Sequence, residues 1–184
     1  MAVDTKNLTY AAFLALPETK QRYEVIDGEM LFMTPSPTPE HQRIALNLSL
    51  QLAPFVREHQ LGDLFFAPLD VLISRAPLRT QQPGLLFVGN QHSDIIGPQH
   101  IEGGPDLIVE ILSPSNTRAD MEGKLQDYWA IGVQECWLIS PEARTIEVLQ
   151  RGLGHFERTG LYGMGDVIDS HVLLNLHLRV EDVW

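Results

Sequence analysis

A charged residue stands inside an apolar stretch of this chain. Glu110 lies in 107-LIVEILS-113, where the surrounding residues predict an interior β-strand. A carboxylate in a protein core must be paired with a cation, protonated or bound to a metal ion, because an unpaired buried charge is very costly. From the residues alone, two interpretations of Glu110 are open: a structural ion pair with an Arg or Lys, or a place in a functional site.

Asp106 is not expected to share a metal ion with Glu110. The two residues lie four apart on one strand, which puts their carboxylates on the same face but roughly 13 Å apart at about 3.3 Å per residue. Hard cations bind oxygen at only about 2.0–2.6 Å. A second metal ligand to join Glu110 should therefore come from an adjacent strand, about 5 Å away. The apolar segment 83-PGLLFVG-89 is the candidate for that strand.

Helices are expected in three places around these strands. Thr9 precedes a short helix over 10–16, and Thr38-Pro39 has the composition of a helix start. The segment that follows Pro39 fits either a strand or a helix by its leucine spacing, and its Leu, Ala, Gln and Asn content favours the helix. Asn116 or Thr117 caps a third helix, which continues through Ile131 and stops at Gly132.

The rest of the chain predicts strands. Asp27-Gly28 within 23-YEVIDGEMLFM-33 is a strong hairpin signal. The other expected strands are short, apolar and bounded by turns: 64–74, 83–89, 105–113, 134–140, 145–150 and 172–178. The sum is one domain over residues 1–184, of α/β or α+β class, with a mixed β-sheet flanked by helices.

Composition narrows the functional classes. The chain has 184 residues, 44% hydrophobic and 20% charged, and its longest apolar runs are far too short to span a membrane. No secretory signal is visible, and the single Cys136 indicates a core thiol in a reducing cytoplasm. The net charge of −11 is unfavourable for binding DNA through its phosphates, since that affinity comes from Lys and Arg.

Several blocks in order resemble the Uma-two-like restriction endonucleases, within the PD-(D/E)XK nuclease superfamily. These blocks are YEVIDGE, S-P-x-x-x-H, Q-P-x-LLFV and PDLIVEILSPSNTRADMEGKLQDYWAIGVQECWLISP. The last block, 105–141, is highly specific, and the resemblance covers roughly residues 8–180. It implies a restriction-endonuclease-like fold and hydrolysis of DNA phosphodiesters with Mg²⁺, or Mn²⁺ in its place. It also implies a homodimer, because such nucleases often pair subunits to cut both strands.

The resemblance also implies roles for individual residues. Glu110 matches the acidic metal ligand of the (D/E)XK half-motif, while Leu112 stands where its lysine would be. Lys124 on the following helix fits the displaced lysine, which would orient or help deprotonate the attacking water. Without the resemblance, Lys124 would be interpreted as a solvated lysine paired with Glu122 or Asp127.

Two further residues are carried by the resemblance. Glu24 matches the acidic residue of the first strand, which assists in positioning metal or water; a solvent-facing hairpin carboxylate is the alternative. His41 is placed at the rim of the site, although a histidine near a helix end is more often structural.

One position departs from the family pattern. Where this chain has Gln82-Pro83-Gly84, the family has Pro-Asp, and that aspartate is the other metal ligand. Gly84 has no side chain that could bind a cation. Asp70 in 68-PLDVLIS-74, expected to pair as a hairpin with 83–89, is the first substitute to consider, though a surface or turn-adjacent position is its default interpretation. Asp94 is a weaker substitute.

Three hypotheses follow. The first is a Mg²⁺-dependent DNA endonuclease that uses Glu24, Glu110 and Lys124 and is impaired by Gly84. The second is a catalytically degenerate nuclease fold that serves as a binding or interaction module, which the charge of −11 also favours. The third is an enzyme that acts on a substrate other than DNA.

Overall fold

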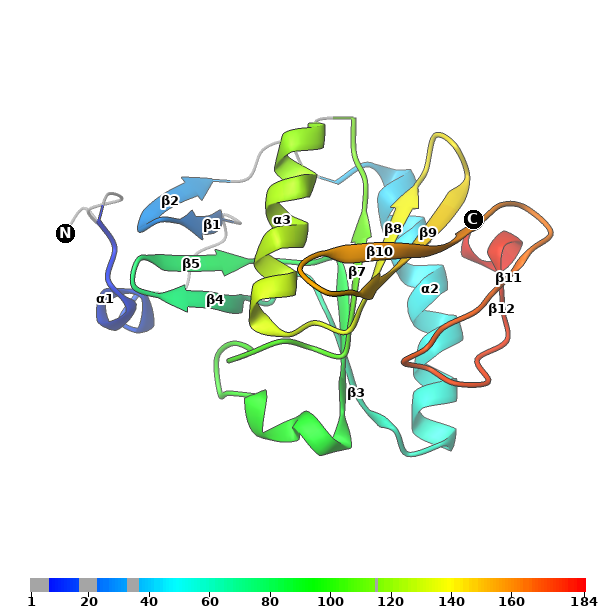
Figure 1. The fold of residues 1–184 in the computed structure, drawn as a ribbon, viewed down its shortest axis with the longest axis horizontal. Coiled ribbons are helices and arrows are strands. Elements are labelled where there is room, and N and C mark those ends of the chain that lie inside the picture. Colours follow the sequence, from blue (N-terminus) through cyan, green and yellow to red (C-terminus); the bar gives the residue numbers. More distant parts are fainter. Residues whose placement is uncertain (1–6, 17–22, 33–36, 115) are drawn as a thin grey trace.

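A six-stranded sheet forms the centre of the molecule (Figure 1). The structure is a computed structural model that describes residues 7–16, 23–32, 37–114 and 116–184. The order is β10-β9-β8-β7-β6-β3, with β7 and β8 parallel and the other neighbours antiparallel. The strands are β3 (Gly62–Phe66), β6 (Leu85–Gly89), β7 (Leu107–Ile111), β8 (Glu135–Ser140), β9 (Thr145–Arg151) and β10 (Phe156–Tyr162). The expected mixed sheet is confirmed, and so is the pairing of β6 with β7.

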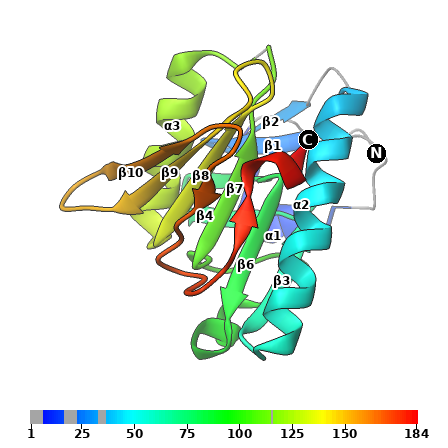
Figure 2. The same ribbon diagram turned by 90° about the vertical axis from the view of Figure 1, so that its right-hand side faces the viewer.

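Helix α2 (Pro39–Glu58) covers one face of the sheet (Figures 1 and 2). Its buried residues recur every four positions, which is the spacing of one face of a helix. They are Ile44, Leu48, Leu52 and Val56. The segment that fitted either a helix or a strand by its leucine spacing is therefore a helix. The helix begins as expected, with Thr38 as N-cap and Pro39 in the first turn.

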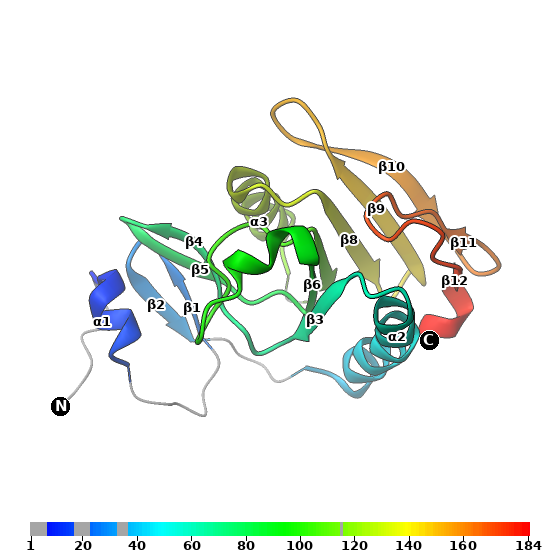
Figure 3. The same cartoon turned by 90° about the horizontal axis from the view of Figure 1, so that it is seen from below.

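Helix α3 (Arg118–Ile131) covers the opposite face and joins the parallel strands β7 and β8, a connection that needs a crossover element (Figure 3). Thr117 caps it through a reciprocal capping box with Asp120, and Gly132 ends it in the left-handed conformation at φ 100°. Both ends agree with the sequence. α3 packs Tyr128 against the sheet in a core that includes Leu86 and Ile108.

The alternation of side chains along β7 decides where Glu110 points. Val109 and Ile111 lie in the core under α2, whereas Ile108 lies in the core under α3. Successive residues of a strand face opposite sides, so Glu110 points toward α3. The helix that follows β7 in sequence is therefore the one that must provide its partners.

A third core stands beside the main sheet, at the N-terminal end of the chain (Figures 1 and 3). It is built from α1 (Tyr10–Leu14), the hairpin β1 (Tyr23–Ile26)–β2 (Glu29–Phe32) and the hairpin β4 (Val71–Arg75)–β5 (Leu78–Gln81). Asp27 and Gly28 both have positive φ, at 51° and 79°, as the expected tight turn requires. β1 lies beside β5, and Val25 N donates to Thr80 Oγ1.

Short elements complete the chain. They are η1 (Asn90–Ile95), β11 (Val167–Ile168), β12 (Leu178–Arg179) and η2 (Val180–Val183). Val180 and Val183 of η2 pack into the core under α2. In the ranges that the structure describes, no helix combines the length and apolarity needed to cross a membrane.

The strand expectations need correction at three places. The segment 64–74 is not one strand: it breaks near Pro68 into β3, which pairs with β6, and β4, which pairs with β5. A proline has no N–H for a sheet ladder, and the chain leaves the main sheet there. The segment 172–178 is mostly a turn, with Leu176 N donating to Leu173 O. β5 and β10 were not anticipated.

Candidate active site

Glu110 and two side chains of α3 form the centre of the site. Tyr128 donates its hydroxyl to Glu110 Oε1 at 2.5 Å, and Lys124 Nζ lies 3.2 Å from the same oxygen. Lys124 and Tyr128 are four residues apart, so they occupy one face of the helix. The buried carboxylate on β7 thus has both a cation and a hydroxyl as partners.

Lys124 also binds a second carboxylate. Its Nζ lies 2.9 Å from Glu24 Oε1 on β1, so one ammonium group joins β1, β7 and α3. The three side chains are only 10–14% exposed. The alternative partners Glu122 and Asp127 are engaged elsewhere: Glu122 pairs with Arg118, and Asp127 with Arg79 and Gln81.

The electrostatics fix the protonation of Lys124. Burial acts to lower the pKa of its ammonium group, but the charges of Glu110 and Glu24 outweigh burial and raise that pKa above the ordinary value. Lys124 is therefore a permanent cation in this arrangement. The roles that the resemblance implies for Lys124 toward the attacking water stay predictions.

Gln82 extends the cluster beyond Glu24. Its backbone N–H donates to Glu24 Oε1 at 3.2 Å, and its side-chain Nε2 donates to Asp70 Oδ1 at 3.1 Å. Burial raises the pKa of Asp70, and the Gln82 hydrogen bond opposes that rise. Asp70 lies beside a bend, as one of its two default interpretations had it, but its expected pairing with 83–89 is wrong. Asp70 is half-buried and directly precedes β4, which pairs with β5 rather than β6.

Gly84 lies next to the pair Leu85↔Val109, which places it across from Glu110 in the antiparallel ladder. Its φ is not in the left-handed region, so an L-amino acid is sterically possible. A Cβ built there would lie 3.2 Å from Val109 O and 3.9 Å from the Ile111 side chain. An aspartate would therefore require the backbone at Val109 to shift by a few tenths of an ångström.

The hydrogen bonds of the cluster described above do not include His41 or Asp94, which the sequence analysis also considered. His41 lies in the first turn of α2, with its backbone N–H on Thr38 Oγ1, and α2 covers the face opposite Glu110. A rim position for His41 remains a prediction. Asp94 is exposed on η1.

Sequence reasoning missed Tyr128 and Gln82. The ring of Tyr128 is fully buried in the core, but its hydroxyl belongs to the site. The signal available in the sequence was its spacing of four residues from Lys124. Gln82 carries no comparable signal, because its contacts with Glu24 and Asp70 arise from the packing of two hairpins.

The donor set fits a weakly held hard cation. Within the described ranges, no three His, Cys, Asp or Glu side chains are grouped so as to hold a metal ion. Mg²⁺ does not require such a group, because it commonly binds one or two carboxylates and completes its shell with water and substrate phosphate. Glu110 and Glu24 supply two carboxylates, and the bonds of Glu110 within the cluster fall on Oε1.

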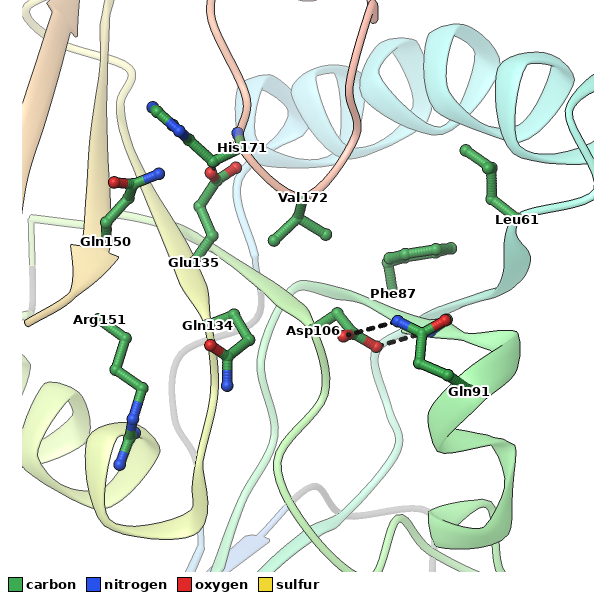
Figure 4. Close-up of a pocket in the computed structure, with 11 residues that line it drawn as sticks. Leu61, Phe87, Gln91, Asp106, Gln134, Glu135, Gln150, Arg151, His171 and Val172 are labelled. Atoms are coloured by element: carbon green, nitrogen blue, oxygen red, sulfur yellow. Dashed lines mark hydrogen bonds between the residues drawn. The ribbon is translucent and has the colours of Figure 1, made fainter.

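A cavity lies at the start of strands β7 and β8 (Figure 4). It measures about 440 Å³ and includes the buried carboxylates Asp106 and Glu135, which lie at the starts of β7 and β8, whereas Glu110 lies near the end of β7. Asp106 accepts from Gly89 N and His92 Nδ1. The three donors to Glu135 are Trp137 Nε1, Ser170 Oγ and His171 N. These carboxylates hold loops in place and are separate from the Glu110 cluster.

Comparison with known proteins gives the family and the fold. The model of the Uma2 family, described as "Putative restriction endonuclease", matches residues 10–181. The chain belongs to the Uma2 family. A crystal structure from Anabaena variabilis, described as "a putative nuclease belonging to DUF820", superposes with a TM-score of 0.76 at 21% identity, covering 96% of this chain and 97% of the other. That similarity shows the fold. No curated protein matches the chain.

Proposed function

We propose that this Uma2 protein is a divalent-cation-dependent nuclease that hydrolyses DNA phosphodiesters, with Mg²⁺ or Mn²⁺ as the cation. The observation that carries the proposal is the bridge from Lys124 to both Glu110 and Glu24, in a chain whose family is described as restriction endonucleases. Glu110 and Glu24 would hold the cation. When bound, it would polarise the phosphate and lower the pKa of a bound water.

The charge balance of the cluster supports a cation requirement. Glu24 and Glu110 carry two negative charges against the single positive charge of Lys124, and Asp70 adds a third when ionised. A phosphodiester anion would be repelled by this surplus unless a divalent cation offset it. Lys124, as a permanent cation, would then stabilise negative charge on the phosphate.

Each remaining side chain has a supporting role in this proposal. Tyr128 and Lys124 fix the orientation of the Glu110 carboxylate, and the Gln82 backbone fixes that of Glu24. Asp70 is linked to the cluster through Gln82, which donates to both Asp70 and Glu24. Asp70 would therefore support Glu24 rather than replace the missing ligand at position 84. Carboxylates held in place by such bonds lose little freedom when a cation or substrate binds.

The proposal extends to assembly and location. A homodimer working in the cytoplasm would place two such sites on the two strands of a duplex. The buried thiol of Cys136 is consistent with a reducing compartment. Sedimentation at several concentrations measures the assembly, and a single-species monomer would count against the homodimer.

A second candidate, the degenerate binding module, is favoured by one observation: Gly84 replaces a carboxylate that the family pattern supplies. Plasmid nicking in Mg²⁺ and in Mn²⁺ separates the candidates. The variants are Gly84→Asp, Gly84→Ala and Glu110→Gln. Gly84→Ala is the matched control, because it adds the same Cβ beside Val109 O without a carboxylate.

The nuclease proposal predicts slow nicking by the wild type and loss of nicking in Glu110→Gln. Gly84→Asp should nick faster by roughly 10- to 100-fold, because even the loss of an outer partner of a metal ligand costs that much in affinity or activity. Nicking by Gly84→Asp alone would support the degenerate module. Absence of nicking by every variant would reject DNA as the substrate.

A further inference from the structure

Two donors converge on one oxygen of Glu110. Tyr128 Oη lies 2.5 Å from Oε1, and Lys124 Nζ lies 3.2 Å from the same atom. Both donors belong to one face of α3. No hydrogen bond or ion pair within the described ranges involves Oε2. Among the described residues the carboxylate is therefore asymmetric, with both of its bonds on Oε1.

We propose that Tyr128 is a positioning residue that restricts Glu110 to binding a cation through Oε2 alone, and that it thereby sets the choice of metal. The inference rests on the proposed function, since it assumes that Glu110 is a cation ligand. It goes beyond that function by assigning selectivity to a residue that would not touch the metal.

The chemistry of the cations makes the restriction selective. Ca²⁺ takes six to eight oxygens in flexible geometry and often uses both oxygens of a carboxylate, whereas Mg²⁺ requires a compact octahedron at about 2.0–2.1 Å. A carboxylate that offers one oxygen suits the octahedral ion and deprives Ca²⁺ of a ligand. The site should therefore discriminate against Ca²⁺ more strongly than its two carboxylates alone would.

Tyr128 is better suited to this role than Lys124. The Tyr128 ring is fully buried in the core between α3 and the sheet, so its hydroxyl has little freedom to leave Oε1. Lys124 instead divides its ammonium between Glu110 and Glu24.

The test is a competition experiment on the full chain. Free Mn²⁺ is followed by electron paramagnetic resonance while Ca²⁺ is added, which gives the ratio of the Ca²⁺ and Mn²⁺ dissociation constants. Tyr128→Phe keeps the ring and removes the hydroxyl. Tyr162→Phe is the matched control, on β10 three strands from β7 in the sheet order. Glu110→Gln identifies the Mn²⁺ that binds at this site.

The ratio should fall by roughly five- to tenfold in Tyr128→Phe, the effect expected from one hydrogen bond, and stay unchanged in Tyr162→Phe. An unchanged ratio in Tyr128→Phe, with Mn²⁺ binding still sensitive to Glu110→Gln, would overturn this inference and leave the proposed function standing. If the wild type binds no Mn²⁺ that depends on Glu110, both are overturned.

A second measurement needs no Tyr128 variant and so does not depend on its folding. The splitting between the asymmetric and symmetric carboxylate stretches in the infrared differs between binding through one oxygen and binding through two. The difference spectrum between wild type and Glu110→Gln isolates the Glu110 bands. One-oxygen binding is expected with both Mg²⁺ and Ca²⁺, and two-oxygen binding of Ca²⁺ by the wild type would overturn the inference.

Discussion

At the scale of residues, the site is a chain of shared partners rather than a set of separate pairs. Glu110 and Glu24 share Lys124, and Glu24 and Asp70 share Gln82. Removing one member of such a network leaves another buried charge or donor without its partner, which costs more than the bond itself contributed. Substitutions that keep shape and hydrogen-bonding capacity are therefore the informative ones.

Asp70→Asn tests the outer end of this network. Burial raises the pKa of Asp70 from its ordinary value of 3.8, so the folded protein binds that proton more tightly than the unfolded chain does. The resulting stability is complete at pH values below the unfolded pKa and is lost as the pH rises through the folded pKa. Asparagine does not titrate, and its Oδ1 can still accept from Gln82.

The stability of Asp70→Asn relative to wild type should therefore increase between acidic and neutral pH. Urea unfolding near pH 4 and near pH 7 measures the change. Asp94→Asn, at an exposed carboxylate on η1, is the control and should show little change. An equal difference between Asp70→Asn and wild type at both pH values would contradict the burial of an ionisable carboxyl at this position.

At the scale of elements, α3 is the helix that carries Lys124 and Tyr128. Its ends could be predicted because capping is local: Thr117, Asp120 and Gly132 interact within a few residues of themselves. Glu110 faces α3 because side chains alternate along β7, the strand that precedes the helix. The hairpin β4–β5 could not be predicted, because the run 64–74 has the same apolar texture on both sides of its break. Which strand pairs with which is decided by packing across the whole fold.

The residues of the site also fall into those that the sequence could predict and those that depend on tertiary packing. The resemblance placed Glu24, Glu110 and Lys124 in one site, and the structure brings these three side chains together. The contacts of Gln82 and Asp70 depend on how the hairpins lie against the main sheet, which no local pattern encodes. Tyr128 stands between these cases: helical spacing relates it to Lys124, but only the tertiary structure shows its hydroxyl on Glu110.

Thr117→Ala tests the dependence of the site on the first turn of α3. The Thr117 hydroxyl accepts from Asp120 N at 3.1 Å, and loss of such a cap costs about 1 kcal/mol of stability. Thermal unfolding should shift downward accordingly. Thr9→Ala removes the corresponding cap from α1 and is the matched control, since α1 carries none of the cluster.

The two cap variants should differ in Mn²⁺ binding. Thr117→Ala loosens the turn that precedes Lys124 and should weaken the binding, whereas Thr9→Ala should not. Equal Mn²⁺ affinity in Thr117→Ala and wild type would show that the first turn of α3 does not contribute to the placement of Lys124.

At the scale of the whole molecule, the electrostatic field opposes a nucleic-acid substrate. The net charge is −11, and many of the described basic side chains already bind carboxylates. These pairs are Arg75–Glu102, Arg79–Asp127, Arg118–Glu122, Lys124–Glu110, Arg158–Glu147 and Arg179–Glu181. Among the described residues, these pairs reduce the positive charge that is free to displace counterions from DNA.

The affinity for DNA should therefore depend weakly on monovalent salt and strongly on the divalent cation. The slope of log affinity against log salt is about −0.9 for each phosphate neutralised on duplex DNA, so proteins with 6–10 phosphate contacts have steep slopes. For this protein we expect a slope shallower than about −2. Fluorescence anisotropy of a labelled duplex measures the slope for the wild type at several KCl concentrations. The duplex carries a nuclease-resistant phosphorothioate backbone, Mg²⁺ is present, and EDTA is the reference. Binding that persists in EDTA with a steep salt slope would reveal a basic surface that the paired arginines do not provide, and would remove the charge-balance argument for a cation in this site.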